Sequence, residues 1–327
     1  RGGLTMYSPI IEQDTVLGII RVEGEPRHGG FSVADLELLK GVSAPAAIML
    51  QNARMHEESL NRERLRRDLE LAAQIQKSFL PQGIYAPGFE LFATYKAAYA
   101  VGGDFYDAFW VGPDQLAVFI GDISGKGVAA ALLMARISGE LRVAALAHID
   151  PVAVFSIMNR ALIGRDQPEL FFTAIYFTLD VKTGVITLAN AGHPPPYVLH
   201  ADGSKTDVIT EGASVAVGML EDPLFTSTEI QLQRGDSLVL YTDGVIEAAD
   251  VRGDLFGDVR LQKALAQVAS SRPKDISDRV LQSVEQYTYN APVSDDLTLF
   301  ICHRETEIDK PAALASPIAH ATAPDAR

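Results

Sequence analysis

The chain has 327 residues, enough for two domains, and 47% of them are hydrophobic, so a large core can form without a metal or a disulfide. The formal net charge of −14 argues against binding to nucleic acid or to an anionic lipid surface, because such partners are bound mainly by Lys and Arg. No apolar run approaches the roughly 18 residues of a membrane span, and we find no signal peptide.

The single cysteine, Cys302, makes an intrachain disulfide impossible and fits a reducing compartment, so we expect a cytoplasmic protein. Cys302 lies in an apolar run, and we interpret it as a core residue rather than as a nucleophile. Because the sequence begins at Arg1 without a methionine, we expect a fragment or a processed chain.

The first elements that the sequence predicts are two short strands and a long helix. Weak alternation at 4–10 and 16–22 predicts two strands, joined by a turn at 12–14. Ser32 fits the N-cap of a following helix, with Asp35 in its first turn.

Apolar residues then recur at heptad spacing, which predicts that this helix continues to about residue 79, with Pro45 as a possible kink. The first run is Leu39, Val42, Ala46, Met49, Ala53, His56 and Leu60, and the second is Leu65, Leu69, Ala72, Ile75 and Phe79. The step of five residues between the runs breaks the heptad and changes the local winding of a coiled coil. Two interpretations stay open, namely a solvated linker helix and a signalling helix through which two copies dimerise.

From about residue 88 the pattern changes to short strands with few helices between them, which favours an antiparallel α+β domain over a βαβ repeat. We expect strands at Phe89–Ala93, Phe105–Val111, Gln115–Asp122, Phe171–Asp180, Val185–Ala191, Tyr197–His200, Ser237–Thr242 and Thr298–Cys302. We expect helices at 128–147, 151–163, 258–269 and 274–289. The last stretch, 305–327, is rich in Ala and Pro without periodicity and predicts a disordered tail.

Four acidic clusters stand at predicted strand ends, each beside a glycine or a turn. They are 101–107 (VGGDFYD), 121–127 (GDISGKG), 241–247 (YTDGVIE) and 294–299 (SDDLTL). A single Asp-Gly pair is most often only a turn. Several Asp side chains at one end of a sheet, however, repel one another unless a cation neutralises them, and Mg²⁺ and Mn²⁺ prefer oxygen ligands. The four clusters together predict a two-metal hydrolytic site.

Two other motifs compete with this interpretation. Residues 125–130 match G-x-G-x-x-A, but no strand with a terminal acid follows at the distance that a dinucleotide site requires. The phosphate-loop pattern also fails, because Gly127 stands where Ser or Thr is needed. The run 190–196 (NAGHPPP) either fixes a rigid turn, which its three prolines favour, or offers His193 to a phosphate or as an acid.

In this order, five segments resemble the SpoIIE-like branch of the bacterial PPM (protein phosphatase 2C-like) serine/threonine phosphatases. They are Gly102–Asp107, Gly121–Gly127, Asn190–Pro194, Thr242–Gly244 and Asp295–Thr298. The preceding 74–81 (QIQKSFLP) is similar to the lead-in of that branch, and the resemblance covers about 70–303. It implies a two-sheet antiparallel β-sandwich flanked by helices, with two Mn²⁺ or Mg²⁺ ions at one end.

The resemblance also implies roles for individual residues. Asp122 and Asp243 would be the catalytic carboxylates, with Asp122 bridging the two ions. Asp104 would support the second ion, directly or through water. The Asp-x-hydrophobic-Thr match favours Asp295 over Asp296 in the first metal site. The implied metal ligands are thus Asp104, Asp122, the backbone carbonyl of Ile123, Asp243, Asp295 and Asp296. No catalytic role carries over to His193, and the branch lacks the phosphate-binding arginine of its eukaryotic relatives.

The N-terminal residues resemble the closing half of a GAF sensory domain. The matching parts are 16–20 (VLGII) and 31–39 (FSVADLELL), running on to 51–54 (QNAR). We therefore expect a partial GAF-like α/β domain over 1–57, a helical linker over 58–82, the phosphatase domain over 83–304 and the tail over 305–327.

These patterns predict metal-assisted hydrolysis of phosphoserine or phosphothreonine on a protein, regulated through the N-terminal sensory part. By family analogy, the substrate is a phosphorylated anti-sigma-factor antagonist. Two alternatives stay open. One is an inactive module that binds a phosphoprotein without hydrolysing it, and the other is a metal-dependent nuclease, which the net charge of −14 disfavours.

Overall fold

The structure is a computed structural model, and it describes residues 4–12, 14–24, 31–81, 83, 85–163, 170–203, 205–268, 271–289 and 291–306. The chain forms two compact units, residues 1–71 and 72–327. Most of the predicted tail, from 307 onwards, lies outside the described residues. No helix in the described ranges combines the length and the apolar character needed to cross a bilayer.

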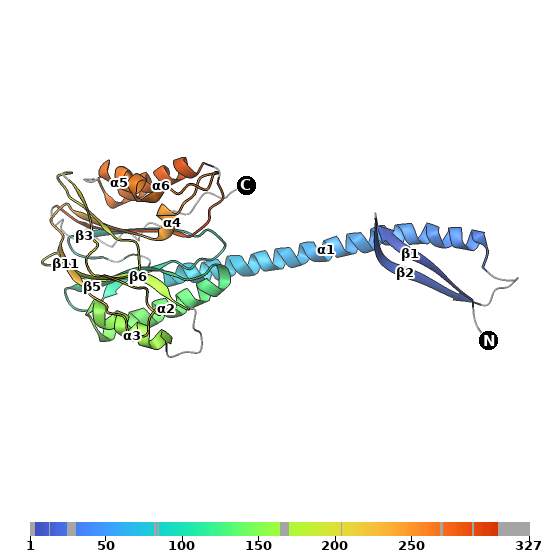
Figure 1. The fold of residues 1–327 in the computed structure, drawn as a ribbon, viewed down its shortest axis with the longest axis horizontal. Helices are drawn as coiled ribbons and strands as arrows, with labels where there is room; N and C mark the ends of the chain where they lie inside the picture. Colours follow the sequence, from blue (N-terminus) through green and yellow to red (C-terminus); the bar gives the residue numbers. More distant parts are fainter. Residues whose placement is uncertain are drawn as a thin grey trace. The chain divides into compact units, whose positions relative to one another are not determined.

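The first unit contains a β-hairpin and most of a long helix (Figure 1). Strands β1 (Leu4–Glu12) and β2 (Thr15–Gly24) pair antiparallel, and helix α1 runs over Val33–Phe79. Ser32 caps α1 as predicted, because its hydroxyl accepts a hydrogen bond from the Asp35 N–H (3.2 Å), and the Asp35 carboxylate accepts one from the Ser32 N–H (2.7 Å). The hairpin and the helix start that the sequence predicts are both confirmed.

The apolar residues of α1 divide between a covered and an exposed face. Leu39 is buried, as is Ser43 one turn later, whose hydroxyl donates to Ser8 on the hairpin (2.8 Å). Val42 and Met49, which belong to the same predicted heptad seam, are instead exposed. Only part of that seam therefore packs within the unit.

The second unit has four layers, with two sheets between two layers of helices (Figure 1). In the first sheet the strand order is β10-β7-β6-β5-β4, and β11 also pairs with β7. In the second sheet the order is β3-β13-β12-β8-β9. The first sheet contains β4 (Phe105–Trp110), β5 (Gln115–Ile123), β6 (Phe172–Asp180), β7 (Val185–Ala191), β10 (Ala213–Ser214) and β11 (Thr228–Gln231). The second contains β3 (Phe89–Lys96), β8 (Tyr197–Leu199), β9 (Thr206–Val208), β12 (Ser237–Tyr241) and β13 (Leu297–Arg304).

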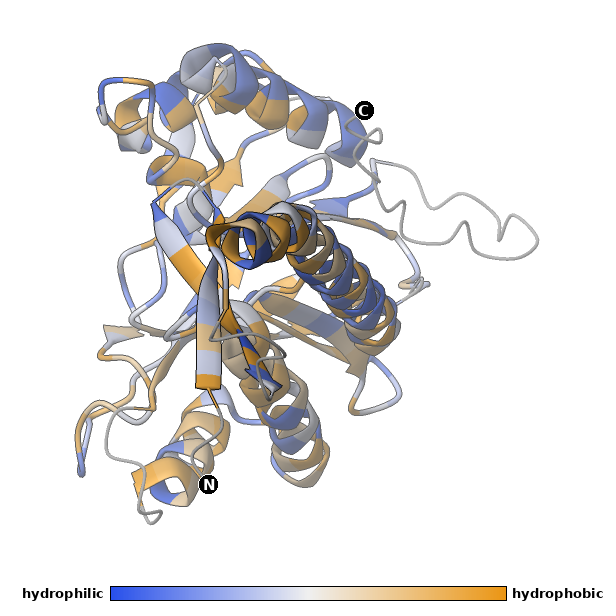
Figure 2. Cartoon of the chain, turned by 90° about the vertical axis from the view of Figure 1, so that its right-hand side faces the viewer, coloured by the Kyte–Doolittle hydropathy of each residue, from blue (hydrophilic) through white to orange (hydrophobic). Residues whose placement is uncertain are grey.

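The helices cover the outer faces of the two sheets. The first sheet packs against α2 (Gly127–Ala147) and α3 (Pro151–Ile163). The second packs against α4 (Asp243–Ile246), α5 (Gly257–Ala266) and α6 (Pro273–Thr288). Helices α5 and α6, at the top of Figure 2, carry mainly hydrophilic residues on their outer side, as expected for helices with one buried face.

Apolar side chains fill the space between each pair of layers. Tyr106 and Phe300 meet between the sheets with ring centroids 6.0 Å apart, whereas Phe119 and Phe155 belong to the core under α2 and α3. The sheet pairings in the described residues are antiparallel, apart from the two-residue parallel pairing of β10 with β7. The predicted α+β fold, a two-sheet sandwich flanked by helices, is confirmed.

Some elements differ from the prediction. Strand β3 continues past Ala93 to Lys96, because it pairs with β13 along its whole length. The sequence also failed to predict β9, β10 and β11, which are two to four residues long and lack a clear apolar alternation. The sequence also did not predict the short helix α4, which begins at Asp243 within the cluster at 241–247.

Candidate metal centre

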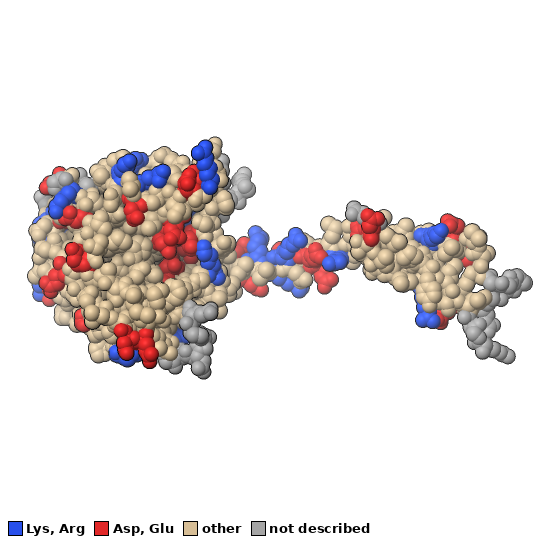
Figure 3. Space-filling view, in the orientation of Figure 1, with Lys and Arg blue, Asp and Glu red and all other residues tan. Residues whose placement is uncertain are grey.

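The four acidic clusters meet at one end of the two sheets. Asp104 directly precedes β4 and Asp122 lies at the end of β5, and these strands are antiparallel neighbours in the first sheet. Asp243 follows β12, and the pair 295–296 directly precedes β13, the antiparallel neighbour of β12 in the second sheet. Acidic side chains accordingly gather on one face of this unit, below α4 (Figure 3). The sheet topology therefore explains why segments nearly 200 residues apart converge.

Asp104 is fixed between the two sheets. Its Oδ2 accepts hydrogen bonds from the hydroxyls of Thr242 (2.7 Å) and Thr298 (2.5 Å), both on the second sheet's side of the site. The side chain is buried, and this burial, together with the charges of Asp122 and Asp296, raises the pKa of Asp104 well above its usual value. The two threonines therefore hold a carboxyl group whose ionisation the protein alone disfavours.

Asp296 fastens the loop that carries Asp104. Its Oδ1 accepts the Ala98 N–H (2.8 Å) and its Oδ2 accepts the Gly103 N–H (2.6 Å). A Cβ atom at Gly102 would lie only 2.0 Å from Asp296 Oδ2, so this approach requires glycine. Asp296 is buried and has both oxygens occupied by backbone donors.

Asp122 and the carbonyl of Ile123 face a common point beside Gly103. A Cβ atom built on Gly103 would lie 3.0 Å from Asp122 Oδ1 and 3.1 Å from the Ile123 oxygen, so the missing side chain leaves the space beside both oxygens open. Burial and the charges of Asp243 and Asp295 raise the pKa of Asp122 to about 7.

Asp243 and Asp295 form the outer part of the site. Burial, followed by the charges of Glu247 and Asp295, raises the pKa of Asp243. Asp295 lies 2.7 Å from the ammonium group of Lys126, which also donates to the Ser294 carbonyl (2.8 Å). This lysine offsets part of the negative charge at the site and, through hydrogen bonding to Asp295, has a raised pKa.

The residues present fit a hard divalent cation in their chemistry, although not in their present arrangement. Within the described part of the chain, no group of three or more His, Cys, Asp or Glu side chains is arranged to hold a metal ion. The contacts explain this, because hydroxyls, backbone N–H groups and Lys126 engage three of the five carboxylates. The donors at the site are nonetheless all oxygens. Burial, followed by repulsion between like charges, raises the pKa values of Asp104, Asp122 and Asp243, and a cation would relieve the repulsion.

Sequence reasoning missed several polar groups that shape the site. Thr242 and Thr298 lie inside the recognised motifs, which gave the signal for their importance but not for their contact with Asp104. Gln76, in the lead-in motif near the end of α1, is buried and its side-chain amide binds both the N–H (3.1 Å) and the carbonyl (2.6 Å) of Gly102. Each of these groups acts through a contact remote in sequence.

His193 adopts the structural role that the prolines of its motif favour. The Asn190 side chain accepts the His193 N–H (2.8 Å) and donates to the His193 carbonyl (2.9 Å), which closes a turn after β7. The imidazole is buried against the Thr173 hydroxyl (2.9 Å), and burial lowers the pKa of His193 to about 3. The ring is therefore neutral at physiological pH, and the contacts support the turn.

Comparison with known proteins places this geometry in a family. Residues 112–305 match the family described as stage II sporulation protein E (SpoIIE), a range that contains three of the four acidic clusters. Protein IcfG of Synechocystis sp. is 30% identical over 269 residues, which cover 73% of this chain and 42% of that protein. Phosphoserine phosphatase RsbP of Bacillus subtilis is 28% identical over 235 residues, which cover 71% of this chain and 56% of that protein. The chain therefore spans about half the length of these two relatives.

The fold also matches a solved structure. The SiaA-PP2C domain of Pseudomonas aeruginosa aligns with a TM-score of 0.65 and 23% sequence identity, covering 75% of this chain and 98% of that chain. This similarity supports the two-sheet sandwich described above.

Proposed function

Because the chain belongs to the SpoIIE family of PP2C-type serine/threonine phosphatases, we propose that it is a metal-dependent enzyme that hydrolyses phosphoserine or phosphothreonine on a regulatory protein. The observation that carries the proposal is that the four acidic clusters meet at one end of the two sheets, close enough for the charges of Asp243 and Asp295 to raise the pKa of Asp122. The name of the relative RsbP, a phosphoserine phosphatase, is consistent with this chemistry.

In this proposal, Asp122, the Ile123 carbonyl, Asp243 and Asp295 hold two Mn²⁺ or Mg²⁺ ions. When bound, the ions would lower the pKa of a water molecule towards about 7 and offset charge on the phosphoryl oxygens. Asp104 would support the second ion, directly or through water.

The remaining polar residues position these ligands. Asp296 holds the glycine loop through two backbone N–H groups, so it supports the site rather than serving as the preferred ligand of the pair. Thr242 and Thr298 orient Asp104 from the second sheet. Lys126 brings a positive charge to the rim, where it can balance an incoming phosphate once a cation has taken its place beside Asp295.

The test is to substitute the central carboxylates. Asp122→Ala and Asp243→Ala should each lower hydrolysis of a phosphoserine peptide with Mn²⁺ by roughly a hundredfold or more, because each removes a ligand that the chemistry needs. Asp222→Ala, at an exposed position outside the four clusters, is the control and should keep the parent activity. Unchanged turnover in both central variants would refute the mechanism.

Calorimetric titration with Mn²⁺, together with a phosphate-release assay, distinguishes the enzyme from an inactive binding module. The enzyme should bind Mn²⁺ and turn over the phosphopeptide, whereas a module would bind the phosphopeptide without releasing phosphate.

For the substrate, we propose a phosphorylated anti-sigma-factor antagonist, by analogy with the family. Comparing phosphoproteins in cells that contain the parent chain or its Asp243→Ala variant tests this assignment, since the substrate should accumulate phosphate only in the variant.

The N-terminal part is proposed to regulate the enzyme. We assign a partial GAF-like domain to 1–57 and a linker to 58–82, and we propose that α1 pairs two copies of a cytoplasmic protein. Support comes from apolar side chains of α1 that remain exposed, among them Met49 (72%) and Leu65 (60%). Light scattering should give the mass of a dimer, and deletion of 1–64 should change the activity. A monomer whose activity survives that deletion would argue against the proposal.

A further inference from the structure

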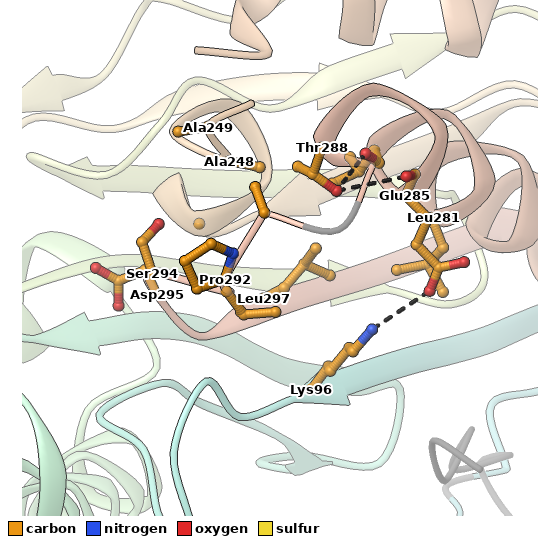
Figure 4. A pocket seen from close by; sticks show the side chains of 14 residues that line it. Lys96, Ala248, Ala249, Leu281, Glu285, Thr288, Pro292, Ser294, Asp295 and Leu297 are labelled. Carbon is orange, nitrogen blue, oxygen red and sulfur yellow. Dashed lines mark hydrogen bonds and ion pairs between the residues drawn. The ribbon is translucent and has the colours of Figure 1, made fainter. Parts of the chain in front are cut away.

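An apolar pocket adjoins the candidate metal centre (Figure 4). It is formed by α4, the end of α6 and the segment 291–297, and it encloses about 60 Å³. A cavity of roughly 10–15 Å³ by the same kind of measure already holds a water molecule, so the pocket has room for a small aliphatic group. Val284 and Leu297 are buried at its base, and Leu281 and Ala248 are half-buried.

The pocket is continuous with the metal centre at one end. Asp295, a proposed ligand, lines both the pocket and the site, and Gly244 follows the ligand Asp243 directly. Lys96 and Glu285 form an ion pair of 3.3 Å at the other side, so the apolar part lies between two charged borders (Figure 4). A substrate whose phosphate reaches the metal centre can therefore place a residue next to the phosphate in this pocket.

The outer lip of the pocket is apolar and open to solvent. Pro292 and Val293 are exposed, Val293 to 53%. A concave apolar surface with a few polar groups at its edge is the usual form of a recognition site, and its coverage by an aliphatic side chain removes apolar area from water. A polar side chain placed against Val284, Leu281 and Leu297 would instead lose its hydration without a partner on that apolar wall.

We propose that this pocket receives one aliphatic side chain that lies within three residues of the phosphoserine or phosphothreonine of a protein substrate, and that it thereby selects substrates by sequence. The inference rests on the proposed phosphatase function. The distance limit follows from an extended chain, which advances about 3.3 Å per residue, because the pocket begins at a metal ligand.

The test uses phosphoserine peptides of equal length in a Ser/Gly background. A single Leu is moved from three residues before the phosphoserine to three residues after it, and kcat/KM is measured with Mn²⁺. Leu at the favoured position should raise kcat/KM roughly tenfold over the peptide without Leu, the usual discrimination of an aliphatic pocket. Equal rates for all peptides would overturn the pocket while leaving the phosphatase function intact. No hydrolysis of these peptides or of p-nitrophenyl phosphate would overturn both.

Variants then assign the preference to this pocket. Ala248→Leu fills it and Val293→Ser removes apolar surface from its lip, and both should bring the ratio of kcat/KM with and without Leu close to one. Using the ratio makes the result independent of a general change in activity. Val259→Ser is the matched control, since Val259 is similarly exposed (64%) but lies on α5 outside the pocket, and it should keep the preference. A preference that survives both pocket variants, or one lost together with a change in oligomeric mass, contradicts the proposal.

Discussion

The five carboxylates of the candidate metal centre fall into two groups that the protein holds in different ways. The inner carboxylates, Asp104 and Asp296, are buried and accept hydrogen bonds mostly from groups far away in the sequence. The outer carboxylates, Asp122, Asp243 and Asp295, are less buried. Asp243 accepts the N–H of the next residue, and Asp295 accepts that of Asp296 and the side chain of Lys126.

We infer from this difference that the inner carboxylates stabilise the structure and that the outer carboxylates serve as metal ligands. If an inner carboxylate left its hydrogen bonds, hydroxyl or backbone donors would remain without an acceptor, and this would lower the free energy of unfolding. Releasing an outer one breaks an exposed ion pair or a local hydrogen bond, and it relieves repulsion between like charges. The outer group is therefore the part of the site that a cation can reorganise at little cost, while the inner group keeps the loops in place.

The largest effect on activity is expected when an outer carboxylate is neutralised. Asp295→Asn should lower phosphopeptide hydrolysis with Mn²⁺ by roughly a hundredfold, because a proposed ligand loses its charge. The free energy of unfolding without metal should change by less than about 1 kcal/mol, since the lost partner is the part-exposed Lys126. Steady-state rates and denaturant unfolding in the presence of a chelator measure the two effects. Full activity, or a large loss of stability, would show that Asp295 belongs with the inner group.

The opposite effect is expected for an inner carboxylate. Asp296→Ala removes the acceptor of the half-buried Ala98 N–H and of the buried Gly103 N–H, and it should lower the free energy of unfolding by about 2 kcal/mol. For a domain of this size, that corresponds to a fall in Tm of roughly 4–8 °C. Thermal unfolding without metal measures it. Asp296→Asn, which keeps one acceptor oxygen, is the matched control and should lose less. An alanine variant as stable as the parent would show that Asp296 has no larger structural role than the outer carboxylates.

The division into two groups could not be predicted from the sequence, although the residues themselves could. An Asp beside a glycine or a turn at a strand end is a local pattern, and the order of the motifs identified all five carboxylates. The inner contacts are not local, because Thr242 and Thr298 reach Asp104 across 138 and 194 residues. Which of two adjacent aspartates turns inward depends on such contacts. For the same reason, the long strands of the sandwich were predicted, but β10, with two residues, depends entirely on β7 beside it.

A smaller effect is expected at Asp236, a carboxylate outside the site. Asp236 is buried like the inner group and accepts the N–H groups of Ala201 (3.0 Å) and Gln233 (3.1 Å). It also contacts an ionisable partner, since His200 Nδ1 lies 3.3 Å from its Oδ2. Because its backbone donors remain, loss of the histidine should leave Asp236 satisfied.

His200 should therefore affect the pH dependence of stability more than stability itself. Its Nε2 lies 3.0 Å from Asp207, and the hydrogen bond to Asp207, together with the charge of Asp236, raises the pKa of His200 above the usual 6.5. A pKa raised on folding stabilises the protein fully below the unfolded value, and the gain is lost as the pH rises through the folded value. Between pH 6 and pH 8 the parent should thus lose stability relative to His200→Gln, by less than about 1 kcal/mol because the pair is partly exposed. Denaturant unfolding at both pH values measures this, with the exposed His148→Gln as control. If the free energy of unfolding changed equally with pH in the parent and in His200→Gln, the ion pair would contribute nothing to stability. Backbone donors alone would then hold the buried Asp236 carboxylate.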